Sequence, residues 1–266
     1  MNPLLARFAS QPALVTPGMD DWFRACIEGA AAHDRFPALA AATMTSMAGV
    51  GAGVGAGVGA GAGSDEVFWY PDDDWRSAYR PYVVRDGILF VPVKGVLLHD
   101  FPWALGSWAT GYIYIWRAIE RGLADSGVRG IALMHDTPGG MVAGCFECVD
   151  KIFAARASKP IRAFAHESAY SAGYAIASAA AAIAVSRTGG VGSIGVVTMH
   201  VDMSKALDDA GYRITLIYAG KHKVDAWPYT ALGDDARARI QARIDDIYGI
   251  FVASVARNRG LAEKAV

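Results

Sequence analysis

The stretch Gly130–Gly140, GIALMHDTPGG, joins a short apolar run to a glycine-rich polar segment. The apolar run predicts a buried strand at Gly130–His135, and Thr137-Pro138-Gly139-Gly140 predicts a tight turn directly after it. We expect a helix to follow over Met141–Ala155. A buried strand, a glycine turn and a helix in this order are typical of a parallel sheet with helices on its faces.

The same alternation extends over most of the chain from residue 82 onward. Strands are predicted at Gly87–Val96, Ile161–Ala165, Ala182–Ser186 and Ile214–Tyr218, with an extended segment at Val191–Val201. Helices are predicted at Tyr112–Ser126, Ser171–Ala181, Ser204–Ala210 and Asp234–Arg257. The last helix places apolar residues along one face: Ile240, Ile244, Ile247, Phe251 and Val255. The pattern predicts an α/β layered fold with a mainly parallel sheet flanked by helices.

Three segments precede this region. Residues 1–48 are predicted to form an N-terminal extension with a short helix at Asp20–Ala32. Residues 49–64 form a Gly/Ala/Val-rich linker that offers little side-chain surface for packing, and residues 65–81 are predicted to be a polar loop. The acidic run Asp72-Asp73-Asp74 could hold a metal ion, but a solvated turn explains it more simply.

Composition excludes several classes of function. Hydrophobic residues make up 53% of the 266 residues and the formal net charge is −1, which predicts a large core and disfavours nucleic acid as a partner. Three cysteines argue against a disulfide framework and for a reducing compartment. The apolar stretch Ala172–Val185 is shorter than the roughly 20 residues that span a bilayer. We expect no membrane span and no signal peptide.

Ser171 is a candidate nucleophile. It follows a predicted strand and opens a helix, where backbone N–H groups favour developing negative charge, although serine at this position can also be a simple N-cap. The N–H groups of Gly139, Gly140 and Ala172 could stabilise an oxyanion if the glycine turn and Ser171 share one edge of the sheet. A plain tight turn is the alternative for Pro-Gly-Gly.

A lysine could supply the base. Lys221 and Lys223 follow the strand predicted at Ile214–Tyr218, and burial against Val224 and Trp227 would lower a lysine pKa toward neutrality. The alternative is a solvated surface lysine, and spacing does not choose between the two. A serine with a lysine base is a known acyl-transfer arrangement that needs no metal or other cofactor.

Other motifs lead to competing hypotheses. Ala169–Gly173 is one residue from the Gly-x-Ser-x-Gly elbow of esterases, which would use partners such as Asp202 and His222. Gly190–Gly195 fits Gly-x-Gly-x-x-Gly, but the residues after it continue a strand, so a dinucleotide site is not expected. The Cys145 and Cys148 pair has no second pair, which argues against zinc.

Residues 88–258 resemble the signal peptide peptidase A family of Ser/Lys-dyad peptidases, which have a ClpP/crotonase-like fold. The matching motifs are Asp136–Gly140 (usually Asp-Ser-Pro-Gly-Gly), Ser171–Tyr174 (usually Ser-Gly-Gly-Tyr), Gly192–Val196 and Gly220–Lys223. The resemblance implies a peptidase domain at residues 82–266, with Ser171 as nucleophile and Lys223 as base. We expect substrate contacts from Thr137, Met141, Ser193 and Ile194.

The N-terminal residues are similar to the phage capsid (prohead) protease branch of this family, through Leu4–Phe8 and Gln11–Leu14. That resemblance implies cleavage of scaffold, portal, capsid or self sequences in the host cytoplasm, within an assembling procapsid, by a homo-oligomer. A general bacterial peptidase and a non-catalytic scaffolding head protein are the alternatives. Family members continue into a closing element, which we expect to be missing because the chain stops at Val266.

Overall fold

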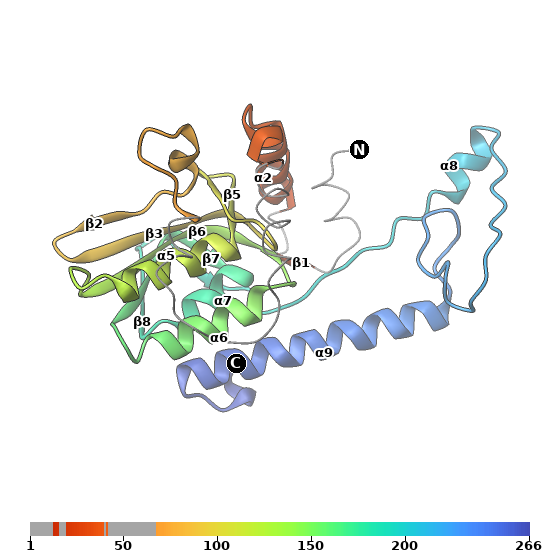
Figure 1. Cartoon of the computed structure of the whole chain (residues 1–266). Coiled ribbons are helices and arrows are strands. Elements are labelled where there is room, and N and C mark those ends of the chain that lie inside the picture. The colour runs from red at the N-terminus through yellow and green to blue at the C-terminus, as the bar shows by residue number, and fades with distance from the viewer. Residues whose placement is uncertain (1–12, 16–19, 40, 42–67) are drawn as a thin grey trace.

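The computed structural model describes residues 13–15, 20–39, 41 and 68–266. Within them a nine-stranded sheet has the order β4-β5-β3-β6-β7-β8, to which β1, β2 and β9 add by pairing with β6, β3 and β7 (Figure 1). The strands are β1 (Ala13–Val15), β2 (Val83–Arg85), β3 (Ile88–Leu98), β4 (Ala104–Leu105), β5 (Ala109–Gly111), β6 (Gly130–Met141), β7 (Ile161–Tyr170), β8 (Ala182–Val185) and β9 (Gly190–Gly192). The Gly/Ala/Val linker lies outside the described residues.

The strands in the middle of the sheet run parallel, and helices connect them. The pairs β3–β5, β3–β6, β6–β7, β7–β8 and β7–β9 are parallel, whereas β1, β2 and β4 pair antiparallel. The helices are α2 (Asp20–Ala32), η1 (Trp75–Tyr79), α5 (Tyr112–Ala124), α6 (Cys145–Ala155), α7 (Ala172–Ala179), α8 (Ser204–Asp209), α9 (Asp234–Arg259) and η2 (Glu263–Ala265). The predicted mixed α/β fold with a mainly parallel sheet is confirmed.

Two apolar cores lie on opposite faces of the sheet. The larger core joins β3, β6 and β7 to α5, α6, α7 and the C-terminal half of α9. The smaller core joins α2 to β3 and the β4–β5 hairpin through residues such as Cys26, Ile27 and Trp103. Leu97 belongs to the first core and Val96 and Leu98 to the second, because neighbouring residues of a strand point to opposite faces.

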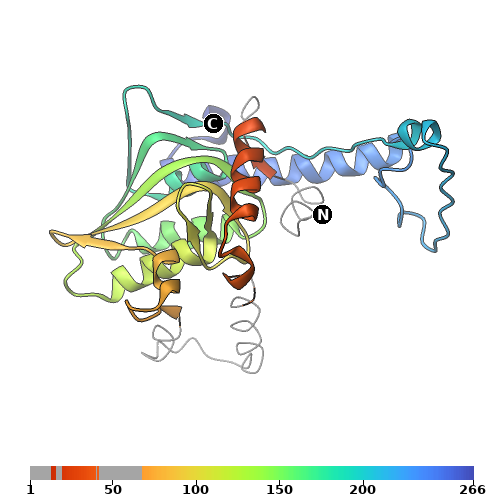
Figure 2. The same ribbon diagram turned by 90° about the horizontal axis from the view of Figure 1, so that it is seen from above.

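Helix α9 extends beyond the body of the protein. Its C-terminal half packs on the larger core through Phe251 and Val255, whereas Ile240, Ile244 and Ile247 are only half-buried. The segment 197–233, which includes α8 and is called the arm below, lies with the N-terminal half of α9 away from the sheet (Figures 1 and 2). Within the described ranges, no helix combines the length and the apolarity needed to cross a membrane.

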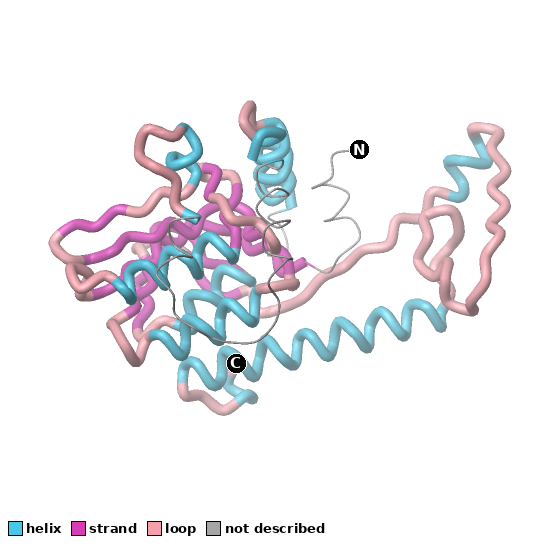
Figure 3. The backbone as a smooth tube through the Cα atoms, in the orientation of Figure 1, coloured by secondary structure: helices cyan, strands magenta, loops and turns pink. Residues whose placement is uncertain are grey.

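Two predictions about local structure are wrong. Thr137–Gly140 is not a turn before a helix at Met141; β6 continues through it to Met141, and α6 begins only at Cys145. Gly140 permits this because a Cβ there would overlap the Leu97 carbonyl of the neighbouring strand. The strand predicted at Ile214–Tyr218 is a loop (Figure 3), since no strand of the described chain pairs with it and Ile217 is 96% exposed.

Residues 68–81 contain more packing than a polar loop. Arg80 is buried, its guanidinium lies 3.9 Å from the ring centroids of Phe68 and Trp103, and its Nε donates to the Pro102 carbonyl. Asp74 caps η1 and pairs with Arg76 instead of facing the other acidic residues. Among the described residues, no group of three or more potential ligands could hold a metal ion.

Candidate active site

The proposed nucleophile lies where three segments meet. Strands β6 and β7 pair as far as Thr137 and Ala169, and β7 then ends at Tyr170. The chain turns at Ser171 into α7, while Tyr170 pairs with Gly192 of β9. The Ser171 N–H donates to the Gly192 carbonyl at 2.7 Å, which joins the start of α7 to the end of β9. The C-terminal ends of three parallel strands therefore surround Ser171.

Ser171 has the conformation of a constrained site residue. Its φ of 52° and ψ of −116° are uncommon for a side chain with a Cβ. Its carbonyl accepts the first hydrogen bond of α7 from Ala175, so Ser171 occupies the N-cap position. Its Oγ makes no capping hydrogen bond; it is buried and has no partner in the described part of the chain. The simple N-cap alternative therefore does not explain this hydroxyl.

The candidate oxyanion donors differ in availability. The Gly139 N–H donates to Thr137 Oγ1 at 3.1 Å, so it is already used in this structure. Ala172 is the first residue of α7. Its N–H group is one of the first donors of the helix, which have no partner within the helix. Gly140 is buried on β6, where it pairs with Leu97 of β3 and Leu14 of β1. Ala172 thus fits the predicted role better than Gly139 in this structure.

Thr137 of β6 contacts both β3 and α7. Its Oγ1 donates to the Gly95 carbonyl at 2.5 Å, and its Cγ2 lies so close to α7 that a Cβ on Gly173 would overlap it. Gly95 has a φ of 64° at a register shift between β3 and β6. Gly95 was not among the predicted site residues, although a glycine inside an apolar strand indicates a bulge. Thr137 is fully buried, so its side chain is not accessible to a substrate in this structure.

The remaining expected substrate residues lie on both sides of Ser171. Met141 is buried in the smaller core at the end of β6. Ser193 directly follows β9 with a φ of 56°, and Ile194 packs partly buried against the larger core. Asp136, the first residue of the glycine motif, accepts a hydrogen bond from Ser168 on β7 at 2.7 Å. These contacts bring the first three predicted motifs together.

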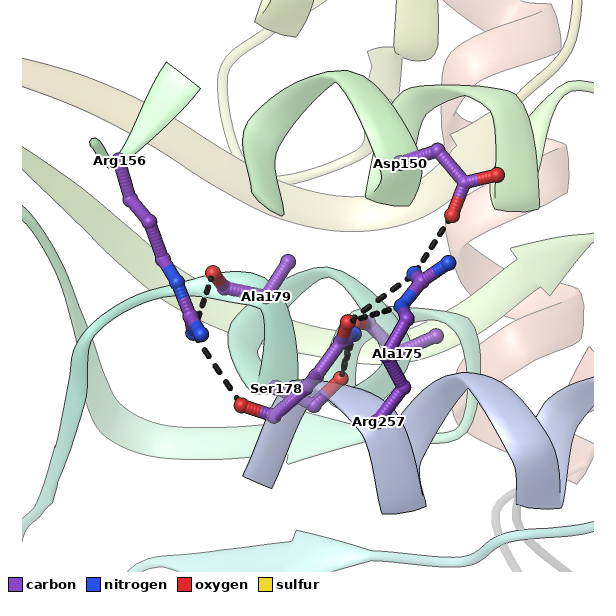
Figure 4. A network of polar contacts seen from close by, with 7 residues as sticks. Asp150, Arg156, Ala175, Ser178, Ala179 and Arg257 are labelled. Carbon is purple, nitrogen blue, oxygen red and sulfur yellow. Dashed lines mark hydrogen bonds and ion pairs between the residues drawn. The ribbon is translucent and has the colours of Figure 1, made fainter. Parts of the chain in front are cut away.

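A polar network links α7 to α6 and α9 (Figure 4). Asn258 of α9 donates to Ser178 Oγ at 2.9 Å, and Ser178 donates to the Ala175 carbonyl at 2.6 Å. Arg257 bridges Asn258 and Asp150 of α6, and Arg156 Nη1 donates to the carbonyls of Ala179 and Asn258. The network ties the helix that begins at Ser171 to both neighbouring helices.

The fourth motif lies elsewhere in the single chain. Lys223 is exposed on the arm, where it borders a small cavity with Val224 and Trp227. The predicted burial of this lysine is therefore not present in one copy. The arm extends away from the sheet that carries Ser171 (Figure 2), so the structure does not bring the serine and the lysine together within the chain.

The competing motifs have structural explanations. His222 pairs with Asp225 at 3.0 Å on the same arm, and Asp202 accepts from the Ser204 N–H, so neither approaches Ser171. Burial raises the pKa of the Cys148 thiol to about 12, as expected for a core cysteine. Gly190–Gly192 is a strand, and no helix follows it directly.

Comparison with known proteins agrees with these motifs. Residues 154–266 match the model of peptidase family S49. The likeness to this family therefore lies in the C-terminal part of the chain. The S49 segment begins near the end of α6 and includes Ser171, the arm with Lys223, and all of α9.

Two phage proteins resemble a longer part of the chain. Capsid assembly protease C of Escherichia phage lambda is 42% identical over 197 residues, which cover 73% of this chain and 45% of that protein. Head-tail preconnector protein GP5 of Enterobacteria phage P21 is 42% identical over 192 residues, which cover 70% and 38%. The chain thus spans less than half the length of these relatives.

Two matches to solved structures have low TM-scores. An enoyl-CoA hydratase from Mycobacterium avium subsp. paratuberculosis K-10 has a TM-score of 0.34 and 15% identity, covering 68% of this chain and 82% of that chain. An enoyl-CoA hydratase/isomerase family member has a TM-score of 0.33 and 13% identity, covering 67% and 79%.

Proposed function

We propose that this protein is a serine endopeptidase that uses Ser171 as nucleophile and Lys223 as base, and that it cleaves head proteins during capsid assembly in the host cytoplasm. The observation that carries the catalytic part is the Ser171 hydroxyl, which is buried, has no partner among the described residues and is held at a positive φ at the start of α7, directly before Ala172. The names of the two phage relatives support the choice of head proteins as substrates.

The chemistry follows from these groups. Neutral Lys223 takes the Ser171 proton as Oγ attacks the peptide carbonyl carbon. The carbonyl oxygen becomes an oxyanion that accepts hydrogen bonds from the Gly140 and Ala172 amides. The C–N bond then breaks, and the leaving amine receives the proton from the lysine. Water, deprotonated by the same lysine, hydrolyses the Ser171 ester and releases the second product.

The base must be neutral, so the Lys223 amine must be shielded from water when the site forms, because desolvation lowers the pKa of a lysine. A second copy of the chain can provide this burial. The arm carries exposed apolar side chains, among them Met199 at 70% and Ile217 at 96%, and a surface of this kind indicates a protein contact. We therefore propose that the arm of one copy packs on the body of another and brings its Lys223 to the neighbour's Ser171.

Mixing two inactive variants tests the dyad and its location. Ser171→Ala and Lys223→Ala should each abolish cleavage of casein and of co-expressed head proteins, whereas Lys221→Ala should not. If each site joins two copies, random co-assembly of equal amounts of the two inactive variants should restore about one quarter of the sites. About half of the sites receive an intact Ser171, and about half of those receive an intact Lys223 from the neighbouring copy.

The possible results separate the hypotheses. No recovery on mixing would place both residues in one copy or reject the dyad. Continued cleavage by both single variants would reject the peptidase proposal and favour a non-catalytic scaffolding protein. Modification of Ser171 by a fluorophosphonate probe in the wild type, and its absence in Lys223→Ala, would support the pairing of the two residues.

A further inference from the structure

The short N-terminal strand β1 occupies the end of β6 that lies beside Ser171. It pairs antiparallel, with Ala13 opposite Met141, Leu14 opposite Gly140 and Val15 opposite Gly139. Its three partners are residues expected to bind the oxyanion or the substrate. Figure 1 shows β1 next to the sheet, far along the chain from the strand it joins.

The side of β6 on which β1 lies follows from the other pairings. Strand β3 pairs with Gly139 and Gly140 through Val96 and Leu97, which fills one side of β6. Strand β7 fills the other side as far as Thr137 and then turns away. A strand has only two pairing sides, so β1 takes the place that β7 vacates. The vacated place is the one next to the Ser171 turn.

The carboxyl end of β1 lies on the side of Ser171. Because the pairing is antiparallel, Val15 lies nearest to Thr137 and Ala13 lies farthest away. The chain therefore approaches Ser171 with the carboxyl side of the strand. An extended peptide that adds to a free sheet edge binds by backbone hydrogen bonds of this kind. In this structure the edge is not free, and residues 137–141 are all buried.

The strand is held close by the helix that follows it. Helix α2 is anchored in the smaller core by Cys26, Ile27 and Ala30. Only residues 16–19 separate Val15 from the start of α2 at Asp20. A segment tethered by a few residues has an effective concentration in the millimolar range at its own site, well above that of a free peptide of the same sequence.

We infer that residues 13–15 are a built-in competitive inhibitor of the proposed active site. They fill the Gly139–Met141 edge, and a substrate peptide enters only after β1 leaves. The inference rests on the proposed function for the role of Ser171. The occupation of the edge, in contrast, can be measured without any catalysis.

The test compares the full wild-type chain with Leu14→Pro/Val15→Pro. Adjacent strand residues point their N–H groups in opposite directions, so the double substitution removes a donor to β6 in either register. Leu14→Val/Val15→Ile is the matched control, since it keeps both N–H groups and the β-propensity. The probe is a fluorescent peptide with the sequence of residues 11–19, and its binding is followed by fluorescence anisotropy.

We expect the peptide to bind the proline variant at least about tenfold more tightly than the wild type or the control, because it no longer competes with the tethered strand. Modification of Ser171 by the fluorophosphonate probe should also be several-fold faster in the proline variant. Equal peptide binding by all three proteins would overturn the inference. Hydrogen exchange of the wild type adds a test that needs no variant: unprotected amides at residues 13–15 and 139–141 would equally overturn it.

Two further outcomes separate this inference from the proposed function. If Ser171 is never modified but peptide binding differs as expected, the peptidase proposal fails and the occupied edge stands. If the intact mass of the wild type shows cleavage just after residue 15, the strand is a substrate and the inhibitor inference is wrong.

Discussion

Burial of His135 makes the stability of this protein sensitive to acid. The imidazole lies on β6 between Val93 and Ala165 of the neighbouring strands, is fully buried, and has no partner for either ring nitrogen within the described chain. Desolvation disfavours the charged ring and lowers its pKa from 6.5 to about 3. The native state therefore keeps His135 neutral at pH values where the unfolded chain binds a proton.

The sign and size of the effect follow from this difference. Stability from neutral His135 is complete above pH about 6.5 and is lost as the pH falls toward 3, at up to about 1.4 kcal/mol per pH unit. Between pH 7 and pH 5 the loss amounts to about 2 kcal/mol. The substitution His135→Leu removes the titrating group and should remove this part of the pH dependence.

Urea unfolding at pH 7 and pH 5, followed by tryptophan fluorescence, measures the difference directly. We expect the fall in unfolding free energy between the two pH values to be about 2 kcal/mol smaller in His135→Leu than in the wild type. His166→Leu is the control, because His166 lies exposed on the adjacent strand β7. An equal fall in the wild type and His135→Leu would refute the assignment of the acid sensitivity to this residue.

Two further predictions concern α7 and its supports, and both are measured by urea unfolding. Gly173→Ala should destabilise the fold by about 1–3 kcal/mol, because the new Cβ would overlap Thr137 Cγ2. Gly249→Ala in α9 meets no atom within 4 Å and should stabilise by about 0.5–1 kcal/mol; equal effects of the two changes would contradict the close approach of α7 to β6. Asn258→Ala leaves Ser178 without a buried donor and should cost about 1–3 kcal/mol. Asp150→Ala breaks only an exposed ion pair with Arg257 and should cost about 0.5 kcal/mol or less, so a larger loss there would mean that the network depends on Asp150.

Much of the fold could be predicted from local patterns. The apolar runs at Gly130–His135 and Ile161–Ala165 are the cores of β6 and β7, because a short apolar run between turn signals buries both of its faces in a parallel sheet. The helix at Asp20–Ala32 has the predicted bounds. Ser171 also lies at the predicted junction of a strand and a helix.

The errors occur where a residue's structure depends on a distant segment. Thr137–Gly140 has the composition of a turn, yet it is a strand because β3 and β1 pair with it from both sides. Ile214–Tyr218 has the composition of a strand, yet it is a loop because the described chain supplies no partner. Backbone hydrogen bonds between strands are non-local, so composition alone does not determine whether they form.

The candidate site divides in the same way. The residue types and their order made Ser171, the glycine segment and a lysine at 221 or 223 candidates, because nucleophile, oxyanion donors and base are each restricted to a few chemical groups. The family resemblance, and not the spacing, chose Lys223, and its role stays a prediction. The folded chain alone showed that Thr137 takes up the Gly139 amide, that Lys223 lies on an exposed arm, and that β1 covers the edge beside Ser171. These facts depend on contacts between residues far apart in the sequence, and such contacts exist only once the sheet and its helices have packed.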